Sequence, residues 1–141
     1  MAHPVHPALV HFPVACWSLA TMGDVASLIF GDPRIWFVSN VLLVFGLVAA
    51  LAAMTAGLFE LRKIDENSAA MRVVTWHMSL AMSAWALYAL SLYMRFNGAA
   101  LIQPGGVAVA LSVLGFLLLA AAGWLGGTLV YGYGIGGDKE G

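Results

Sequence analysis

Charged side chains are scarce in this chain of 141 residues. Asp, Glu, Lys and Arg make up 9% of the sequence, whereas 62% of the residues are hydrophobic and the mean hydropathy is +0.90. A typical soluble domain carries about a quarter charged residues, so this composition excludes a soluble fold. The formal net charge of −1, without a dense basic cluster, gives no reason to expect nucleic acid or a lipid-headgroup site.

Three long runs contain no charged residue at all, namely residues 35–59, 73–94 and 96–137. Each is long enough for a membrane-spanning helix, which needs roughly 20 apolar residues. A fourth segment, residues 7–30, is less apolar but still long enough. The sequence therefore predicts an all-α fold, an integral membrane four-helix bundle, in which residues 1–141 form a single domain. The expected helices span about residues 7–30, 35–60, 70–95 and 105–131.

Cysteine is nearly absent as well, because Cys16 stands alone. An internal disulfide and a thiolate-rich zinc or iron–sulfur site are thereby excluded. No Ser-His-Asp motif or phosphate-binding glycine loop appears, so the sequence leaves open whether the protein is an enzyme. Residues 1–23 contain no Lys or Arg, which a signal peptide would carry, so we expect the first helix to stay in the mature protein.

Four passes place both termini and the loop at residues 62–67 on one side of the membrane, which we call the loop-62 side. Four of the six Lys and Arg residues belong to this side, and Arg34 and Arg95 belong to the other. The positive-inside rule therefore predicts that the loop-62 side, with both termini, is cytoplasmic. The four basic residues are Arg62, Lys63, Arg72 and Lys139.

Two histidines stand out at the loop-62 side. His11 lies about one turn into the first expected helix, and His77 enters the third helix from the same side, so the two depths should be similar. Histidines at matched depth on different helices are the arrangement by which a four-helix bundle holds haem, with one imidazole on each face of the iron. We therefore predict a b-type haem ligated by His11 and His77, and electron transfer as the activity.

Other residues at the same membrane edge suit this haem site. Arginines there could neutralise the propionates, and glycines could admit the flat porphyrin. Such glycines equally suit plain helix packing, because small residues let backbones approach closely, and this interpretation stays open. Besides the two histidines, the candidate cofactor-binding residues are Arg62, Arg72, Gly57, Gly123, Gly126 and Tyr131.

The polar groups at this edge also permit other functions. His6, His11, His77 and Glu60 could bind or handle copper or zinc without haem. The histidines could instead hydrogen-bond Glu60 or Tyr131 and only fix the bundle. A further alternative is a cofactor-free accessory subunit of a larger membrane complex. The partners we expect are the lipid bilayer and, with haem, a redox partner or a quinone; a homo-oligomer is a further alternative.

Asp24 belongs to the opposite membrane edge, about 20 Å along the helix from His11. Its natural partners there are Arg34 and Arg95. A proton or ion path between the two edges is a weak third interpretation, because the middle of the bundle offers few polar groups. Those groups are Ser39, Thr55, Ser83 and Ser112.

Several motifs together resemble one protein family. The chain opens with H-P-x-x-x-H-F-P at residues 6–13, and its last expected helix closes with G-G-x-L-V-Y at residues 126–131. The second helix ends with Gly57-x-x-Glu60, and His77 lies early in the third. This pattern, spread over nearly the whole chain, resembles domain of unknown function family 2231. The resemblance implies a small four-helix protein of the bacterial cytoplasmic membrane, often with Asp at the position of Glu60, and it carries no settled activity.

Overall fold

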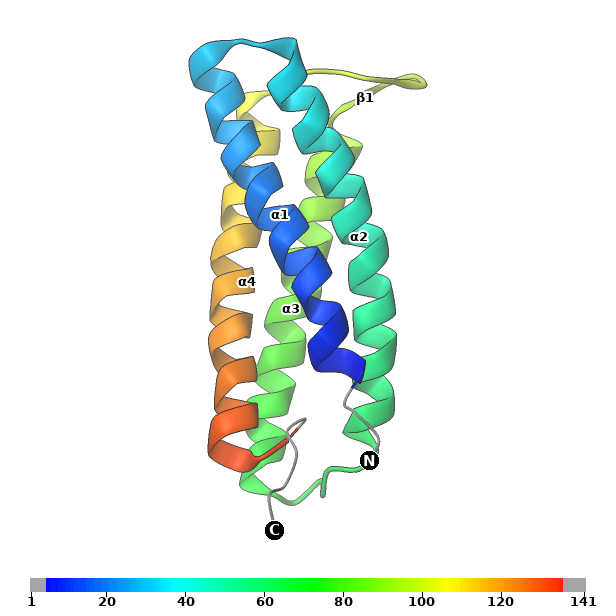
Figure 1. Cartoon of the computed structure of the whole chain (residues 1–141), viewed down its shortest axis with the longest axis vertical. Coiled ribbons are helices and arrows are strands. Elements are labelled where there is room, and N and C mark those ends of the chain that lie inside the picture. Colours follow the sequence, from blue (N-terminus) through cyan, green and yellow to red (C-terminus); the bar gives the residue numbers. More distant parts are fainter. Residues whose placement is uncertain (1–4, 136–141) are drawn as a thin grey trace.

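The computed structural model of the protein describes residues 5–135, and it contains four long helices that run up and down in turn (Figure 1). Each helix is long and apolar enough to cross a membrane, which confirms the predicted four-helix membrane bundle. Lys139, which we counted toward the loop-62 side, lies outside the described residues. The helices are α1 (Val5–Phe30), α2 (Pro33–Leu61), α3 (Ala69–Tyr93) and α4 (Gly106–Tyr133).

The helix ends follow turn signals in the sequence. Gly31 adopts a positive φ of 64° after α1, and Asp32 caps α2 by accepting a hydrogen bond of 2.9 Å from the Arg34 backbone N–H. Ser68 caps α3 in the same way. At the end of α4, Gly134 takes a φ of 65° and its N–H reaches a carbonyl of the last turn at 3.1 Å. The resulting connections are short, so consecutive helices lie antiparallel.

A small β-hairpin joins α3 to α4. Strand β1 (Phe96–Asn97) pairs with β2 (Ala100–Leu101) in antiparallel register, and Gly98 turns the chain with a φ of 63°. In Figure 1 this hairpin projects sideways from one end of the bundle. The sequence predicts only a break here, because two-residue strands are too short to show an alternating pattern.

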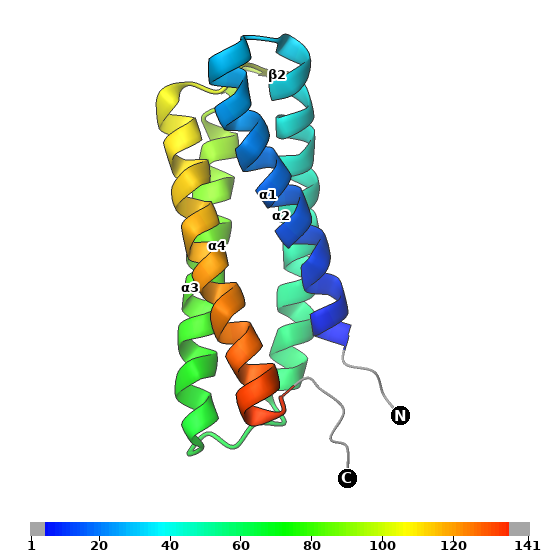
Figure 2. The ribbon, with the colours of Figure 1, turned by 60° about the vertical axis from the view of Figure 1, so that its left-hand side comes forward.

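The four helices form two closely packed pairs. α1 lies along α2 and α3 lies along α4, whereas contact between the pairs is sparser. Figure 2 shows the two pairs side by side. We call α1 with α2 the first hairpin and α3 with α4 the second hairpin. Any group that binds between the hairpins would therefore have to displace fewer contacts than one that binds within a hairpin.

The core between the hairpins is built around Trp17 and Tyr88. Their rings stack with centroids 4.6 Å apart and an interplanar angle of 18°, and both side chains are buried. A Cβ at Gly46 would overlap the Trp17 indole, and a Cβ at Gly115 would lie 3.0 Å from the Tyr88 ring. These two glycines therefore let each aromatic ring lie directly against a neighbouring helix backbone.

The outer surface of the bundle is apolar and aromatic. Near the loop-62 side, Trp76 is 62% exposed, Trp124 80% and Tyr131 92%. Phe45, at mid-depth in α2, is also exposed. Such side chains gain nothing from facing water, whereas lipid accepts them, and Trp and Tyr favour the membrane interface. The surface thus agrees with a chain that spans the bilayer.

We predict that Gly46→Ala destabilises the protein, whereas Gly123→Ala does not. The added methyl group at Gly46 collides with Trp17, while nothing lies within 4 Å of a Cβ at Gly123. Overpacking of this kind costs about 1–3 kcal/mol, and alanine at an open helical position gains roughly 0.5–1 kcal/mol. Thermal unfolding of the detergent-purified variants measures both effects. Equal melting temperatures for the two variants would contradict the close approach of Trp17 to α2.

Candidate functional sites at the two ends of the bundle

His6 is held in the first turn of α1 by contacts with α2. Its ring Nδ1 lies 2.7 Å from the Ala53 carbonyl oxygen. Because a carbonyl only accepts, this contact assigns the proton to Nδ1 and leaves Nε2 with its lone pair. The backbone N–H of His6 donates to Glu60 Oε1 at 3.3 Å, so the carboxylate provides an acceptor for a backbone N–H in the first turn of α1. A Cβ at Gly57 would lie 3.1 Å from the imidazole, which explains the need for glycine there.

His77 is held in the same manner on α3. Its Nδ1 lies 2.8 Å from the Ala122 carbonyl oxygen of α4, and a Cβ at Gly126 would lie 3.4 Å from the ring. The imidazoles of His6 and His77 lie in an edge-type arrangement, with centroids 6.3 Å apart and planes at 89°. Among residues 5–135, neither Nε2 has a hydrogen-bond partner. We call these two imidazoles the histidine pair.

His11 does not join the histidine pair. Its side chain is exposed, and its Nδ1 lies 3.3 Å from the carbonyl of Ala8 in its own helix. Five residues turn an ideal helix by about 140° relative to His6, so when His6 points toward the second hairpin, His11 points outward. The structure therefore brings His77 together with His6, in place of the His11 that the sequence predicts.

The remaining predicted site residues divide into two groups. Gly57 and Gly126 contact the histidine pair, as described. Gly123 has open space around it, and Tyr131 is almost fully exposed. Arg62 and Arg72 are exposed at the loop-62 side, where the Arg62 guanidinium lies 5.4 Å from the centroid of the Phe59 ring. The two arginines thus share the membrane edge of the histidine pair without contacting its rings.

The histidine pair does not form a dense metal cage. In the described part of the chain, no group of three or more His, Cys, Asp or Glu side chains is placed to hold a metal ion. The Glu60 carboxylate contacts the His6 backbone instead of an imidazole. The pair therefore offers two nitrogen donors, and a bound metal would need its other ligands from elsewhere.

A second polar site lies at the other end of the bundle, centred on Asp24 and Arg95. The Arg95 guanidinium donates to both carboxylate oxygens, with a distance of 2.8 Å from Nη1 to Oδ1. Both side chains have no exposed surface. The Ser39 hydroxyl also donates to Asp24. Arg34, the other predicted partner, instead forms an exposed ion pair with Asp32 at 3.1 Å, because Asp32 is its neighbour at the start of α2.

Buried polar groups satisfy the rest of the Arg95 guanidinium. It donates to Asn40 Oδ1 at 2.8 Å, to Ser91 Oγ at 2.8 Å and to Ser112 Oγ at 2.9 Å. The sequence singled out Ser39 and Ser112 as isolated polar residues but did not predict that they meet. The signal was there, since a lone hydroxyl in an apolar helix needs a partner. We call these side chains, with Asp24 and Arg95, the Asp24 network.

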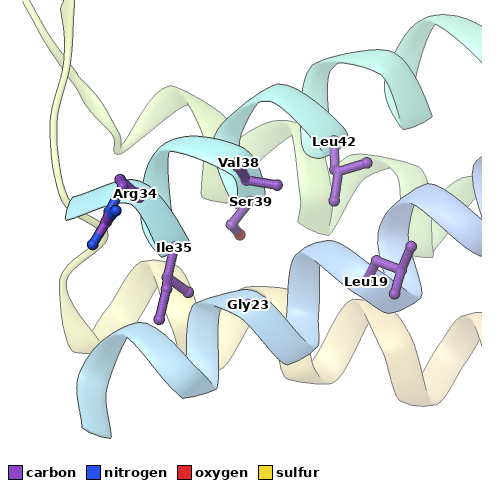
Figure 3. Close-up of a pocket in the computed structure, with 7 residues that line it drawn as sticks. All are labelled: Leu19, Gly23, Arg34, Ile35, Val38, Ser39 and Leu42. Carbon is purple, nitrogen blue, oxygen red and sulfur yellow. The ribbon is translucent and has the colours of Figure 1, made fainter. Parts of the chain in front are cut away.

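A shallow groove runs along the outer face of the first hairpin near the Asp24 network (Figure 3). It exists because Gly23 brings α1 close to α2, and a Cβ there would lie 3.2 Å from Ser39. Its walls are mainly aliphatic, and the Ser39 hydroxyl is committed to the Ala20 carbonyl and Asp24. The groove therefore presents little chemistry and suits contact with lipid.

The fold and the two sites define a small multi-pass helical membrane protein whose polar groups are gathered at both ends of the bundle. A family model described as "Predicted membrane protein (DUF2231)" matches residues 2–139, and the chain belongs to this family. This match confirms the resemblance seen in the sequence motifs. No curated protein and no solved structure matches the chain.

Proposed function

We propose that the protein is a membrane-embedded b-type haem protein that transfers electrons, and that His6 and His77 would hold the haem. The observation that carries the proposal is the histidine pair itself. Two imidazoles from different hairpins lie with their centroids 6.3 Å apart, and each is oriented by a hydrogen bond from Nδ1 to a helix carbonyl. Such a hydrogen bond fixes the tautomer and orientation of a metal-binding histidine and leaves Nε2 as the donor atom.

The spacing of the rings supports the proposal. A bond from a metal to an imidazole nitrogen is about 2.0 Å, so two imidazoles could share one metal with their centroids up to roughly 6 Å apart. The observed separation is 6.3 Å. The porphyrin would lie between the two hairpins, where helix contact is sparser than within each hairpin. The exposed Arg62 and Arg72 at the same edge are then suited to the propionates.

Haem fits this donor set better than zinc does. Two nitrogen ligands leave a zinc ion short of the four that structural sites use. A porphyrin supplies four ligands itself and needs only two from the protein. Held by His6 and His77, a haem would supply one-electron redox chemistry between a reduced donor such as a quinol and a one-electron acceptor protein.

We expect His6→Ala and His77→Ala each to abolish or strongly shift the haem spectrum, whereas His11→Ala leaves it intact. The reason is that His6 and His77 lie next to each other, whereas His11 is exposed on its own helix. The measurement is the absorption spectrum of detergent-purified protein, oxidised and dithionite-reduced, from cells supplied with iron and a haem precursor. His11→Ala is the matched control, because it removes the same ring from the same helix.

Two other results would redirect the proposal. A featureless spectrum from well-folded wild-type protein would rule out haem. Metal analysis of that sample would then identify copper or zinc if the protein handles either metal. If no metal is bound and His6→Ala and His77→Ala only lower the melting temperature, the histidine pair is structural.

We also predict that Gly57→Val lowers the haem content per chain, whereas Gly127→Val does not. A side chain at Gly57 pushes against the His6 imidazole, while nothing lies within 4 Å of a Cβ at Gly127. Both changes place the same β-branched residue near the end of a helix, so they carry a similar propensity cost. Haem-to-protein ratios of the two purified variants decide the question. Equal ratios would show that the position of His6 is immaterial to binding.

We propose further that the loop-62 side faces the cytoplasm of a bacterial cell. Arg62, Lys63 and Arg72 are exposed there, whereas Arg95 is buried in the Asp24 network and does not act as a loop charge. In a variant with Cys16 replaced, a cysteine at Lys63 should resist a membrane-impermeant maleimide in intact spheroplasts, and one at Asn97 should react. The reverse labelling pattern would invert the topology.

A further inference from the structure

Contacts of the first hairpin recur in the second hairpin at constant sequence offsets. Adding 71 to a residue number in α1 gives the equivalent position in α3, and adding 69 to a number in α2 gives the equivalent position in α4. In each hairpin a histidine Nδ1 meets an alanine carbonyl, and a glycine one turn further along lies against the ring. The equivalent residues are His6 and His77, Ala53 and Ala122, and Gly57 and Gly126.

The same offsets relate the aromatic core. Trp17 of α1 corresponds to Tyr88 of α3, and the glycine beneath each ring, Gly46 or Gly115, is also equivalent. The two rings stack on each other across the interface between the hairpins. A residue that contacts its own equivalent lies on a two-fold axis. The Trp17–Tyr88 stack and the histidine pair therefore mark one axis that runs along the bundle.

The buried positions repeat as well. In α1 and α3, Pro13 and Ala84 are both buried, as are Ala20 and Ser91. Five of the seven buried positions in α2 correspond to buried positions in α4, which is too many for helices that face the core at unrelated angles. These five pairs are Ser39 and Ala108, Asn40 and Val109, Leu43 and Ser112, Gly46 and Gly115, and Ala53 and Ala122.

Asp24 and Arg95 obey the same relation, since they too lie 71 residues apart. We infer that the chain consists of two equivalent helical hairpins joined head to tail, and that Asp24 and Arg95 are the docking contact between them on the two-fold axis. Two identical charges could not occupy this position, because buried like charges repel without solvent to screen them. The two equivalent positions on the axis therefore carry opposite charges.

Equivalence of the hairpins has a consequence that can be tested. If the positions of Asp24 and Arg95 are interchangeable, the bundle needs one acidic and one basic residue there, but either position can hold either residue. The hydroxyl partners must then exchange with the charges, because Ser39 serves Asp24, whereas Ser91 and Ser112 serve Arg95. The equivalent positions of these three serines are Ala108, Ala20 and Leu43.

The experiment compares single, exchanged and control variants of the full chain. Asp24→Arg and Arg95→Asp alone each leave two like charges buried, so we expect a fall in melting temperature of roughly 10 °C or more, or a loss of monodisperse protein in detergent. The double variant D24R/R95D should regain part of that loss. Adding S39A/A108S, A20S/S91A, L43S/S112L and N40V/V109N should restore most of it, and the last pair is included because Asn40 also accepts from Arg95. Arg34→Ala, at the exposed ion pair with Asp32, should change little.

The inference is overturned if the fully exchanged variant is no more stable than the single variants. Positions 24 and 95 would then each require their own residue, and the repeated contacts would not show that the two hairpins are equivalent. All readouts use protein without added haem, so the result does not depend on the proposed cofactor. Intact rescue together with a featureless absorption spectrum of the wild-type protein grown with a haem precursor would contradict only the proposed function.

Discussion

Burial of opposite charges without water is the constraint on which the arrangement of the two hairpins depends. Asp24 and Arg95 have no exposed surface, and an unpaired charge at that depth would be very costly. Two donating guanidinium nitrogens against two carboxylate oxygens allow little rotation, so the pair sets the distance and angle of α1 relative to α3. The Trp17–Tyr88 stack and the histidine pair lie along the same contact between α1 and α3. The relative position of their rings therefore depends on the same distance and angle.

The sequence predicted the helices well because the bilayer leaves a chain few choices. A charge-free run of more than twenty residues must satisfy its backbone internally, and a helix does so. Hydropathy could not predict that the helices pair two by two. In a membrane the outward face of each helix is as apolar as the core, so no amphipathic pattern marks the buried side. The repeated glycines carried that information, but they are equally consistent with several packing partners.

At the candidate sites, rotation about the helix axis decided what could be predicted. Depth alone gave Arg34 and Arg95 as candidate partners of Asp24, and only Arg95 pairs with it, since Arg34 pairs with Asp32. Depth in the membrane was also the reason for choosing His11. It cannot distinguish His11 from His6, because α1 begins at Val5 and includes both histidines. Only the direction of each side chain around α1 distinguishes them. That direction follows from tertiary contacts such as the one between His6 and the Ala53 carbonyl.

The two ends of the bundle differ in how completely their polar groups are used. In the Asp24 network the carboxylate, the guanidinium and the serine hydroxyls all have partners within the described chain, so the network gains nothing from a ligand. In the histidine pair each imidazole uses one nitrogen and keeps one lone pair. A lone pair without a protein partner is available to a ligand that coordinates it. The Asp24 network therefore holds the hairpins together, and a ligand gains most at the histidine pair.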